Sequence, residues 1–233
     1  MPIFVVATPI GNLNDLSVRA QEALKEADLV ACEDTRVTRR LLNHVGAHPP
    51  MISTHQHADD RKVREVVDAV IAGKKVVLVS DAGTPGLNDP GGLVVEAVLH
   101  QDTSAQIVPI PGPNAAVTLL SVSGFPSDRF LFLGFPPHKK GRETFFKELA
   151  ASEITTLFYE SPHRLLKALT SLSELCPNRP LVIGRELTKV FETIYRGLPG
   201  ELLAHFEQHA PRGEFVCLLA PQKRKEKHPT SSL

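Results

Sequence analysis

The stretch Lys75-Val-Val-Leu-Val-Ser80-Asp-Ala-Gly-Thr-Pro85-Gly-Leu-Asn-Asp-Pro90-Gly91 decides the fold class. Its first six residues are a short β-rich run, which predicts a strand. Glycines and prolines around two aspartates end that run, and this composition predicts a loop. In an open parallel sheet, ligands bind at the carboxyl ends of the strands. The stretch therefore predicts an α/β fold with a functional loop directly after a strand.

Short β-rich runs alternate with helical segments on both sides of this stretch. The alternation predicts a largely parallel sheet that is covered by helices. The segment Asp59–Ala72 places five aliphatic side chains on one helical face, and Gly73 follows it as a C-cap. The strands predicted in the first half are Ile3–Thr8, Leu29–Cys32, Met51–Thr54, Lys75–Ser80 and Gln106–Pro109.

A Pro/Gly-rich stretch over residues 124–142 interrupts the alternation, and we interpret it as the passage into a second domain. We predict an N-terminal α/β domain over residues 1–123, a C-terminal mixed α/β domain over 124–221 and a flexible basic tail over 222–233. The tail has no apolar periodicity that could repay the entropy of ordering it. The elements predicted in the second half are helix Glu143–Ala151, strand Ile154–Tyr159, helix Pro162–Leu175, strands Leu181–Arg185 and Glu192–Arg196, helix Glu201–Gln208 and strand Glu214–Ala220.

The composition is that of an ordinary globular protein. Of 233 residues 42% are apolar, and 26 basic residues balance 26 acidic ones. This balance excludes binding of nucleic acid mainly through an overall positive field, although local basic patches remain possible. Three scattered cysteines (Cys32, Cys176, Cys217) do not fit a disulfide framework or a zinc site, and no apolar run approaches the ~18 residues of a membrane span. We expect a soluble cytoplasmic protein.

Four loops after predicted strands carry unusual residues. The glycines of Asp81–Gly91 let the main chain approach a ligand closely, and its prolines restrict the loop. Such a loop suits an adenosine or amino acid moiety, although a long turn with capping aspartates is the structural alternative. It matches neither a phosphate-binding Walker A loop nor the dinucleotide fingerprint. The other three loops are Thr8–Asn12, Glu33–Arg36 and Pro109–Asn114.

Charged clusters leave two interpretations open. Glu33–Arg36 can supply a general base or cap the helix that follows it. Tyr159–Arg164 and Arg185–Lys189 can bind phosphate or form structural ion pairs. The segment His55–Asp60 resembles a metallohydrolase motif but lacks its last histidine, so we predict a helix N-cap at Asp59 or Asp60 and no metal.

Taken together, six ordered motifs resemble the small-subunit ribosomal RNA methyltransferases of the tetrapyrrole methylase superfamily. The resemblance runs from about Ile3 to Ala220. It implies a homodimer of two-domain α/β subunits, each a class III methyltransferase that holds S-adenosylmethionine in the cleft between its domains. The motifs are Thr8–Leu13, Glu33–Arg36, Ser80–Pro85 with Asn88–Gly91, Pro111–Pro113, Tyr159–Arg164 and Arg185–Lys189.

The resemblance also implies the reaction, which is methylation of the ribose 2'-hydroxyl of a cytidine in the decoding centre of 16S ribosomal RNA, without metal or membrane. Many similar proteins continue with a basic helical extension, so we expect this chain to differ in its hold on RNA and not in its methyl-transfer core. The residues implied at the cofactor are Pro9, Gly11, Asp81, Ala82, Gly83, Thr84, Pro85, Gly112, Asn114 and Ala115.

Methyl transfer to oxygen is an in-line displacement at an activated carbon, so positioning supplies most of the acceleration. A base or a cation that eases loss of the hydroxyl proton would help. The catalytic candidates are Lys189, Glu186, Glu160, Glu33 and Arg36. The candidates for RNA binding are Arg36, Arg39, Arg40, Lys139, Lys140, Arg142, Arg164 and Arg185.

Three other functions compete with this one. The same fold methylates tetrapyrrole carbons or a modified histidine of a translation factor, and an apolar acceptor site would favour that activity. A non-catalytic RNA-binding assembly factor would tolerate Asp81→Ala. A metallohydrolase built on His55 and His57 would contain metal.

Overall fold

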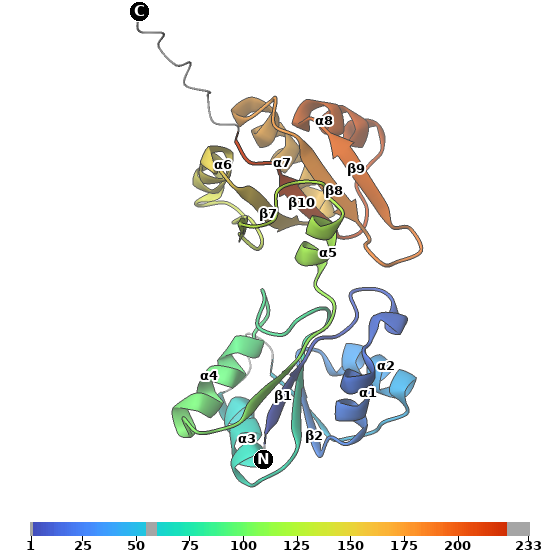
Figure 1. The fold of residues 1–233 in the computed structure, drawn as a ribbon, viewed down its shortest axis with the longest axis vertical. Helices are drawn as coiled ribbons and strands as arrows, with labels where there is room; N and C mark the ends of the chain where they lie inside the picture. Colours follow the sequence, from blue (N-terminus) through green and yellow to red (C-terminus); the bar gives the residue numbers. More distant parts are fainter. Residues whose placement is uncertain (1, 55–59, 223–233) are drawn as a thin grey trace, which may run out of the picture. The chain divides into compact units, whose positions relative to one another are not determined.

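The structure is a computed structural model that describes residues 2–54 and 60–222 (Figure 1). The chain divides into two compact units, Met1–Ala115 and Ala116–Leu233. The division falls at the start of helix α5 (Ala115–Ser121), whereas the predicted boundary follows residue 123. Residues 124–142, which we interpreted as the passage into the second domain and assigned to it, lie in the second unit.

The first unit contains a five-stranded parallel sheet, as the alternation of its sequence predicts. Its strand order is β3-β2-β4-β1-β5, and β1 pairs with both β4 and β5. All five predicted strands form, with ends that differ by up to two residues. The strands are β1 (Ile3–Val6), β2 (Leu29–Cys32), β3 (Met51–Ser53), β4 (Val76–Val79) and β5 (Ile107–Ile110).

Helices cover both faces of this sheet (Figure 1). Helices α1 (Val18–Lys25) and α2 (Thr35–Val45) pack on one face, and α3 (Asp60–Ile71) and α4 (Gly91–Gln101) pack on the other. Alternate residues of β4 enter the two cores, since Val77 and Val79 face α1 and α2 whereas Val76 and Leu78 face α3 and α4. Burial on both sides explains why the strand is apolar throughout.

The second unit is a mixed α/β layer with strand order β6-β7-β10-β8-β9. Only β6 and β7 pair in parallel, and the other pairs are antiparallel. The three helices that follow α5 share one core with the sheet. The sequence did not predict β6, which lies inside the Pro/Gly-rich stretch. The elements after α5 are β6 (Phe130–Phe132), α6 (Arg142–Ala151), β7 (Thr155–Glu160), α7 (Pro162–Leu175), β8 (Leu181–Arg185), β9 (Thr193–Gly197), α8 (Pro199–Gln208) and β10 (Phe215–Leu219).

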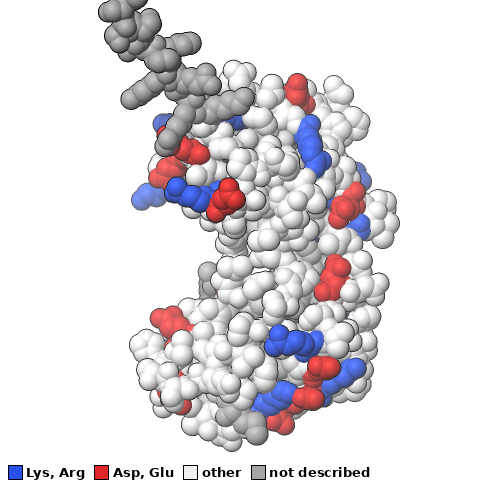
Figure 2. All heavy atoms as spheres, viewed as in Figure 1, with Lys and Arg blue, Asp and Glu red and all other residues white. Residues whose placement is uncertain are grey.

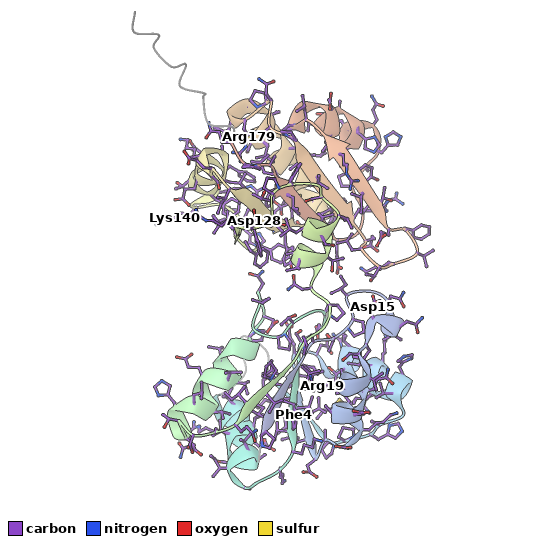
Figure 3. All side chains as sticks on the ribbon, viewed as in Figure 1. Phe4, Asp15, Arg19, Asp128, Lys140 and Arg179 are labelled. Carbon is purple, nitrogen blue, oxygen red and sulfur yellow. The ribbon has the colours of Figure 1, made fainter. Side chains whose placement is uncertain are left out.

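A buried arginine joins the ends of two elements of this unit. The guanidinium of Arg179, labelled in Figure 3, donates to the carbonyls of Leu149, Ala150 and Ser152 at the end of α6. It also donates to the carbonyl of Ala220, just after β10. A cation at a helix C-terminus satisfies carbonyls that have no partner within the helix. Arg179 therefore fixes where the last strand ends.

The three cysteines are buried and unpaired. Burial raises the pKa of the Cys32, Cys176 and Cys217 thiols above the ordinary value. Such thiols pack as small apolar side chains. In the part of the chain that the structure describes, no helix is long and apolar enough to cross a membrane.

Candidate functional site: the strand-end loops of the first unit and a charged cluster of the second

Hydrogen bonds join the loops that follow β1, β4 and β5. Thr8 and Gly83 exchange two backbone hydrogen bonds of 2.9 and 3.0 Å. The hydroxyl of Thr84 donates to the carbonyl of Pro113 at 3.2 Å, which ties the loop after β4 to the loop after β5. The parallel sheet thus brings together residues that lie far apart in the sequence, as the strand-end rule predicts.

The loop after β2 joins the same edge of the sheet. The backbone N–H of Asp34 donates to the carboxylate of Asp81 at 3.0 Å. The hydroxyl of Ser53, at the end of β3, donates to the carbonyl of Glu33 at 2.8 Å. All four loops predicted from the sequence therefore lie on one rim.

Glycines keep this rim open at two points. Gly83 adopts a left-handed conformation with φ of +85°. A Cβ atom on Gly112 would lie 3.0 Å from the Cβ of Ala7, so a side chain there would force the loop away from β1. Gly11 and Gly112 are both exposed. The main chain at the rim is accordingly accessible to a ligand.

Asp89 fixes the far half of the loop after β4. One carboxylate oxygen accepts the N–H groups of Gly86 at 2.7 Å and of Gly91 at 2.8 Å. Asn88, between them, has a φ of +65°, and Leu87 is 48% exposed. A side chain whose one oxygen holds two N–H groups stabilises a single loop conformation. This is the long turn with a capping aspartate that the sequence left as the structural alternative for the loop.

The carboxylates of the rim perturb one another. Burial, together with the charges of Asp81 and Asp89, raises the pKa of Glu33. Burial and the charges of Asp34 and Asp89 likewise raise the pKa of Asp81. Hydrogen bonds from Arg36 lower the pKa of Asp34 to about 2. Burial is the larger cause of both raised values, and the neighbouring carboxylates add to it.

This arrangement suits a cationic ligand with hydrogen-bonding groups. A positive charge beside Glu33 and Asp81 would favour their ionised forms, and accessible main-chain groups would bind the polar parts of the ligand. The predicted cofactor residues belong to these loops, with Ala115 as the first residue of α5. They are Pro9, Gly11, Asp81, Ala82, Gly83, Thr84, Pro85, Gly112, Asn114 and Ala115.

Two of the catalytic candidates form an ion cluster on the loop between β8 and β9. The ammonium of Lys189 lies 3.0 Å from Glu186 and 2.9 Å from Glu214. Burial lowers the pKa of Lys189, but hydrogen bonds to the two carboxylates outweigh it, and the net shift is upward. Burial raises the pKa of Glu186, but hydrogen bonds from Glu214 and Lys189 outweigh it, and the net shift is downward. Both groups therefore stay charged at neutral pH, and neither is a ready proton acceptor.

The backbone of this loop is strained. Glu186 and Thr188 have φ values of +51° and +67°, which non-glycine residues adopt rarely. The hydroxyl of Thr188 is buried without a hydrogen-bond partner. Strain of this kind costs about 1–3 kcal/mol per residue and gathers at functional sites. The Lys189 cluster therefore stays a candidate for binding a substrate, as a fixed cation.

Gly213 makes room for that cluster, and its replacement should disturb it. Its φ is +90°, and a Cβ atom would lie 2.6 Å from the side chain of Glu186. We expect Gly213→Ala to destabilise the protein by about 1–3 kcal/mol and to displace Glu186 from Lys189. Chemical denaturation measures the first effect. Gly200→Ala, where a Cβ meets no atom within 4 Å, is the control. Equal stability of the two variants would contradict the prediction.

Glu160 lies in a buried ion cluster rather than at an accessible site. Its side chain is fully buried, and its two oxygens contact Arg142 at 2.7 Å and Arg164 at 3.0 Å. The two arginine side chains are themselves only 15% and 16% exposed. The geometry therefore does not support Glu160 as a base, or Arg142 and Arg164 as phosphate ligands. It favours the structural ion pairs that the sequence left open.

The remaining basic candidates differ in accessibility. Arg36, Arg39 and Arg40 are exposed on α2, and Arg36 pairs with Asp34 at 2.6 Å. Lys139 and Lys140 are exposed on the loop before α6. The guanidinium of Arg185 donates to the carbonyl of Arg212 at 2.7 Å. On the face shown in Figure 2, basic and acidic side chains are interspersed, in keeping with the balanced net charge.

Two predictions fall on parts that the structure does not describe. His55, His57 and Asp59 lie outside the described residues, as does the tail from Lys223 onward. Asp60 begins α3. Among residues 2–54 and 60–222, no three side chains of His, Cys, Asp or Glu form a group that could hold a metal ion.

Sequence comparison finds relatives over almost the whole chain. Residues 2–203 match the family described as Tetrapyrrole (Corrin/Porphyrin) Methylases. A protein of Synechocystis sp. named Ribosomal RNA small subunit methyltransferase I is 42% identical over 99% of this chain and 82% of its own length. Proteins of the same name from Thermotoga maritima (39% identical, 94% of this chain, 97% of that protein) and Mesorhizobium japonicum (44%, 97%, 78%) are also similar.

Solved structures share the fold at low sequence identity. Cobalt precorrin-4 methyltransferase CbiF superposes with a TM-score of 0.70 at 18% identity, over 94% of each chain. The methyltransferase CobJ gives 0.68 at 19% identity, over 96% of each chain. A uroporphyrin-III C-methyltransferase from Thermus thermophilus in complex with S-adenosylhomocysteine gives 0.62 at 19% identity, over 94% of this chain and 97% of that one.

Proposed function

The chain belongs to the tetrapyrrole methylase family, and from this premise we propose that it methylates small-subunit ribosomal RNA with S-adenosylmethionine as donor. The acceptor in this proposal is the ribose 2'-hydroxyl of a cytidine of the decoding centre in 16S ribosomal RNA. Such an acceptor places the reaction in the cytoplasm, and we propose a homodimer as the active form. The structural observation that supports donor binding is the rim where four loops bring Glu33 and Asp81 beside accessible main chain.

The residues of the rim fit S-adenosylmethionine. The donor carries a positive sulfonium and a positive ammonium, and a positive charge would stabilise the ionised forms of Glu33 and Asp81, whose pKa values are raised by burial and by neighbouring carboxylates. Its adenosine and carboxylate need hydrogen bonds and close contact, which the exposed glycine main chain at Gly11 and Gly112 permits. Asp89 keeps the Gly86–Gly91 segment in one conformation, so this segment loses little conformational entropy when the donor binds.

When bound, S-adenosylmethionine supplies a methyl group that is already activated by its attachment to a charged sulfur. The protein therefore contributes mainly by holding and orienting the donor and the acceptor and by excluding water, and less by activating the methyl group. A ribose hydroxyl gives up its proton reluctantly, and a carboxylate of raised pKa is suited to accept one. Glu33 is the candidate base with this property. Lys189, held protonated by Glu186 and Glu214, is suited to attract a phosphate of the acceptor.

The raised pKa values predict a pH dependence that separates the donor from its product. Because the sulfonium favours ionised Glu33 and Asp81, donor affinity should fall as the pH drops through the raised pKa values of these two carboxylates. S-adenosylhomocysteine lacks the sulfonium charge, so its affinity should fall less. Calorimetric titration of both ligands across this range measures the difference. Parallel pH profiles for the two ligands would contradict the assignment of these carboxylates to the donor.

The experiment that tests the whole proposal follows isotopically labelled methyl groups. The protein is incubated with labelled S-adenosylmethionine and small ribosomal subunits that lack the modification, and the nucleosides are then digested and analysed by mass spectrometry. Labelled 2'-O-methylcytidine is the expected product. Label in another nucleoside would keep ribosomal RNA as substrate and reject the cytidine. Donor binding without any label in RNA would reject the proposal and direct attention to tetrapyrrole-type acceptors or to a binding-only role.

A further inference from the structure

The loop between β6 and α6 presents an aromatic ring and two lysines to solvent. Phe135 is 53% exposed. Lys139 and Lys140 are exposed on the same loop, and Figure 3 labels Lys140 at the edge of the second unit. Within the described residues neither lysine takes part in an ion pair. Residues 134–141, which we call the Phe135 loop, include no acidic residue.

Aromatic contacts hold the ring of Phe135 in place. The centroid of this ring lies 5.3 Å from that of Tyr159, which in turn packs against Phe132 at 4.9 Å. The backbone N–H of Tyr159 donates to the carbonyl of Gly134 at 2.9 Å, so the loop is fixed immediately before the ring. Phe135 is therefore a positioned aromatic side chain with a large part of its surface free.

The buried ion cluster described above holds the rest of the loop. Arg164 donates to the carbonyl of Pro136 at 3.1 Å and Arg142 to that of Pro137 at 3.4 Å. Both guanidinium groups are fixed by Glu160. This explains why two arginines and a glutamate are buried here, since they set the conformation of a loop whose exposed side chains are basic and aromatic. A loop ordered in advance loses little entropy when it binds a partner.

The chemistry of the loop matches single-stranded RNA. Proteins bind single strands by stacking bases on aromatic side chains and by placing cations near the phosphates. Phe130 is also exposed, and it lies on the same face of strand β6 as Phe132, because side chains alternate along a strand. A second copy of the chain is a poorer partner, because two copies of the Phe135 loop that face each other in a symmetric dimer would bring lysines against lysines.

We propose that the Phe135 loop binds a single-stranded segment of RNA, with Phe135 stacked on a base and Lys139 and Lys140 near the phosphates. This inference rests on the proposed ribosomal RNA acceptor and identifies a part of the chain that recognises it. The sequence suggested the two lysines as RNA ligands, whereas the structure adds Phe135 and removes Arg142 and Arg164 from the contact.

A tryptophan probe tests the stacking directly. The chain contains no tryptophan, so Phe135→Trp introduces a single indole at the proposed contact. Its fluorescence should be quenched when small ribosomal subunits or single-stranded RNA of the decoding region are added.

The salt dependence of binding tests the two lysines. Replacing both Lys139 and Lys140 by alanine in the Phe135→Trp background should reduce the magnitude of the slope of log affinity against log salt by about 1.4, because two phosphates of the single strand are then no longer neutralised. Lys167→Ala, an exposed lysine of α7, is the matched control.

Side-chain replacements at Phe135 separate stacking from general apolar contact. Phe135→Leu keeps an apolar side chain but removes the aromatic face, and it should raise the KM for ribosomal subunits about 10-fold, with the KM for S-adenosylmethionine unchanged. Phe135→Tyr keeps the ring and should retain the affinity of the natural protein. The oligomeric state of each variant is measured by sedimentation.

The outcomes distinguish this inference from the proposed function. If the natural protein methylates RNA while Phe135→Leu behaves like it and the tryptophan is not quenched, the loop contact is rejected and the function stands. If no methyl group reaches RNA but RNA quenches the tryptophan, the function is rejected and the contact stands. If Phe135→Leu changes the oligomeric state and leaves RNA affinity unchanged, the loop is a protein interface and the inference is rejected.

Discussion

Asp81→Asn should lower the affinity for S-adenosylmethionine about 10- to 100-fold. The amide can still accept the N–H of Asp34, so the link between the loops after β2 and β4 remains. What disappears is one of the two negative charges with a raised pKa at the rim. A hydrogen bond to a charged group contributes about 1.5–3 kcal/mol, which corresponds to this loss of affinity. Calorimetric titration with the donor measures it.

A matched aspartate at the other end of the sheet serves as the control for Asp81. Asp102 follows α4, and its carboxylate accepts the backbone N–H of Ser104 at 2.8 Å, much as Asp81 accepts that of Asp34. Asp102→Asn should bind the donor like the natural protein. Unchanged donor affinity in Asp81→Asn would show that the rim carboxylates do not hold the donor. An equal loss in both variants would point to a general effect on the fold.

Glu160→Ala should destabilise the second unit by about 3–5 kcal/mol. The substitution leaves the guanidinium groups of Arg142 and Arg164 buried without the carboxylate that compensates both. An uncompensated buried charge is among the most destabilising results of a single substitution. The free energy of unfolding, measured by chemical denaturation, checks the value.

The same unit provides an exposed counterpart of this ion pair. Glu143 and Lys147 of α6 have the same four-residue spacing as Glu160, the last residue of β7, and Arg164 of α7, but both side chains are mostly exposed. Glu143→Ala should therefore leave the unfolding free energy almost unchanged, since solvent already screens the pair. If Glu160→Ala were as well tolerated as Glu143→Ala, the buried cluster could not be what orders the Phe135 loop.

The sequence predicted most of the fold because local pattern and tertiary environment agree. β4 is apolar because both of its faces are covered, and helix Pro162–Leu175 begins at a proline and was predicted with its correct ends. The β6 strand was missed because three residues within a Pro/Gly-rich stretch give no periodicity to detect. The end of the first unit was placed after α5 because a sequence pattern cannot show which core a short helix joins.

The positions of the candidate-site loops were predictable because they follow from the sheet topology. The ion-pair partners of individual side chains were not. A parallel sheet brings its strand-end loops together, so the rim around Asp81 followed from the prediction of a parallel sheet. The sequence could not show that Glu160 forms ion pairs with both Arg142 and Arg164. Nor could it show that Glu214, just before β10, forms an ion pair with Lys189. These pairings depend on strand register and on burial. The sequence could not distinguish Asp89 from the other possible capping aspartates, because its two N–H partners, Gly86 and Gly91, are visible only in the structure.

The burial of the three thiols makes the protein convenient to label. Each sulfur lies in a core and has a raised pKa, so maleimide and methanethiosulfonate reagents should leave the native chain unmodified. A cysteine introduced at Lys140 would then be the single reactive site, with no need to remove natural cysteines. A spin label or dye attached there would report whether the surroundings of the Phe135 loop change when small ribosomal subunits are added.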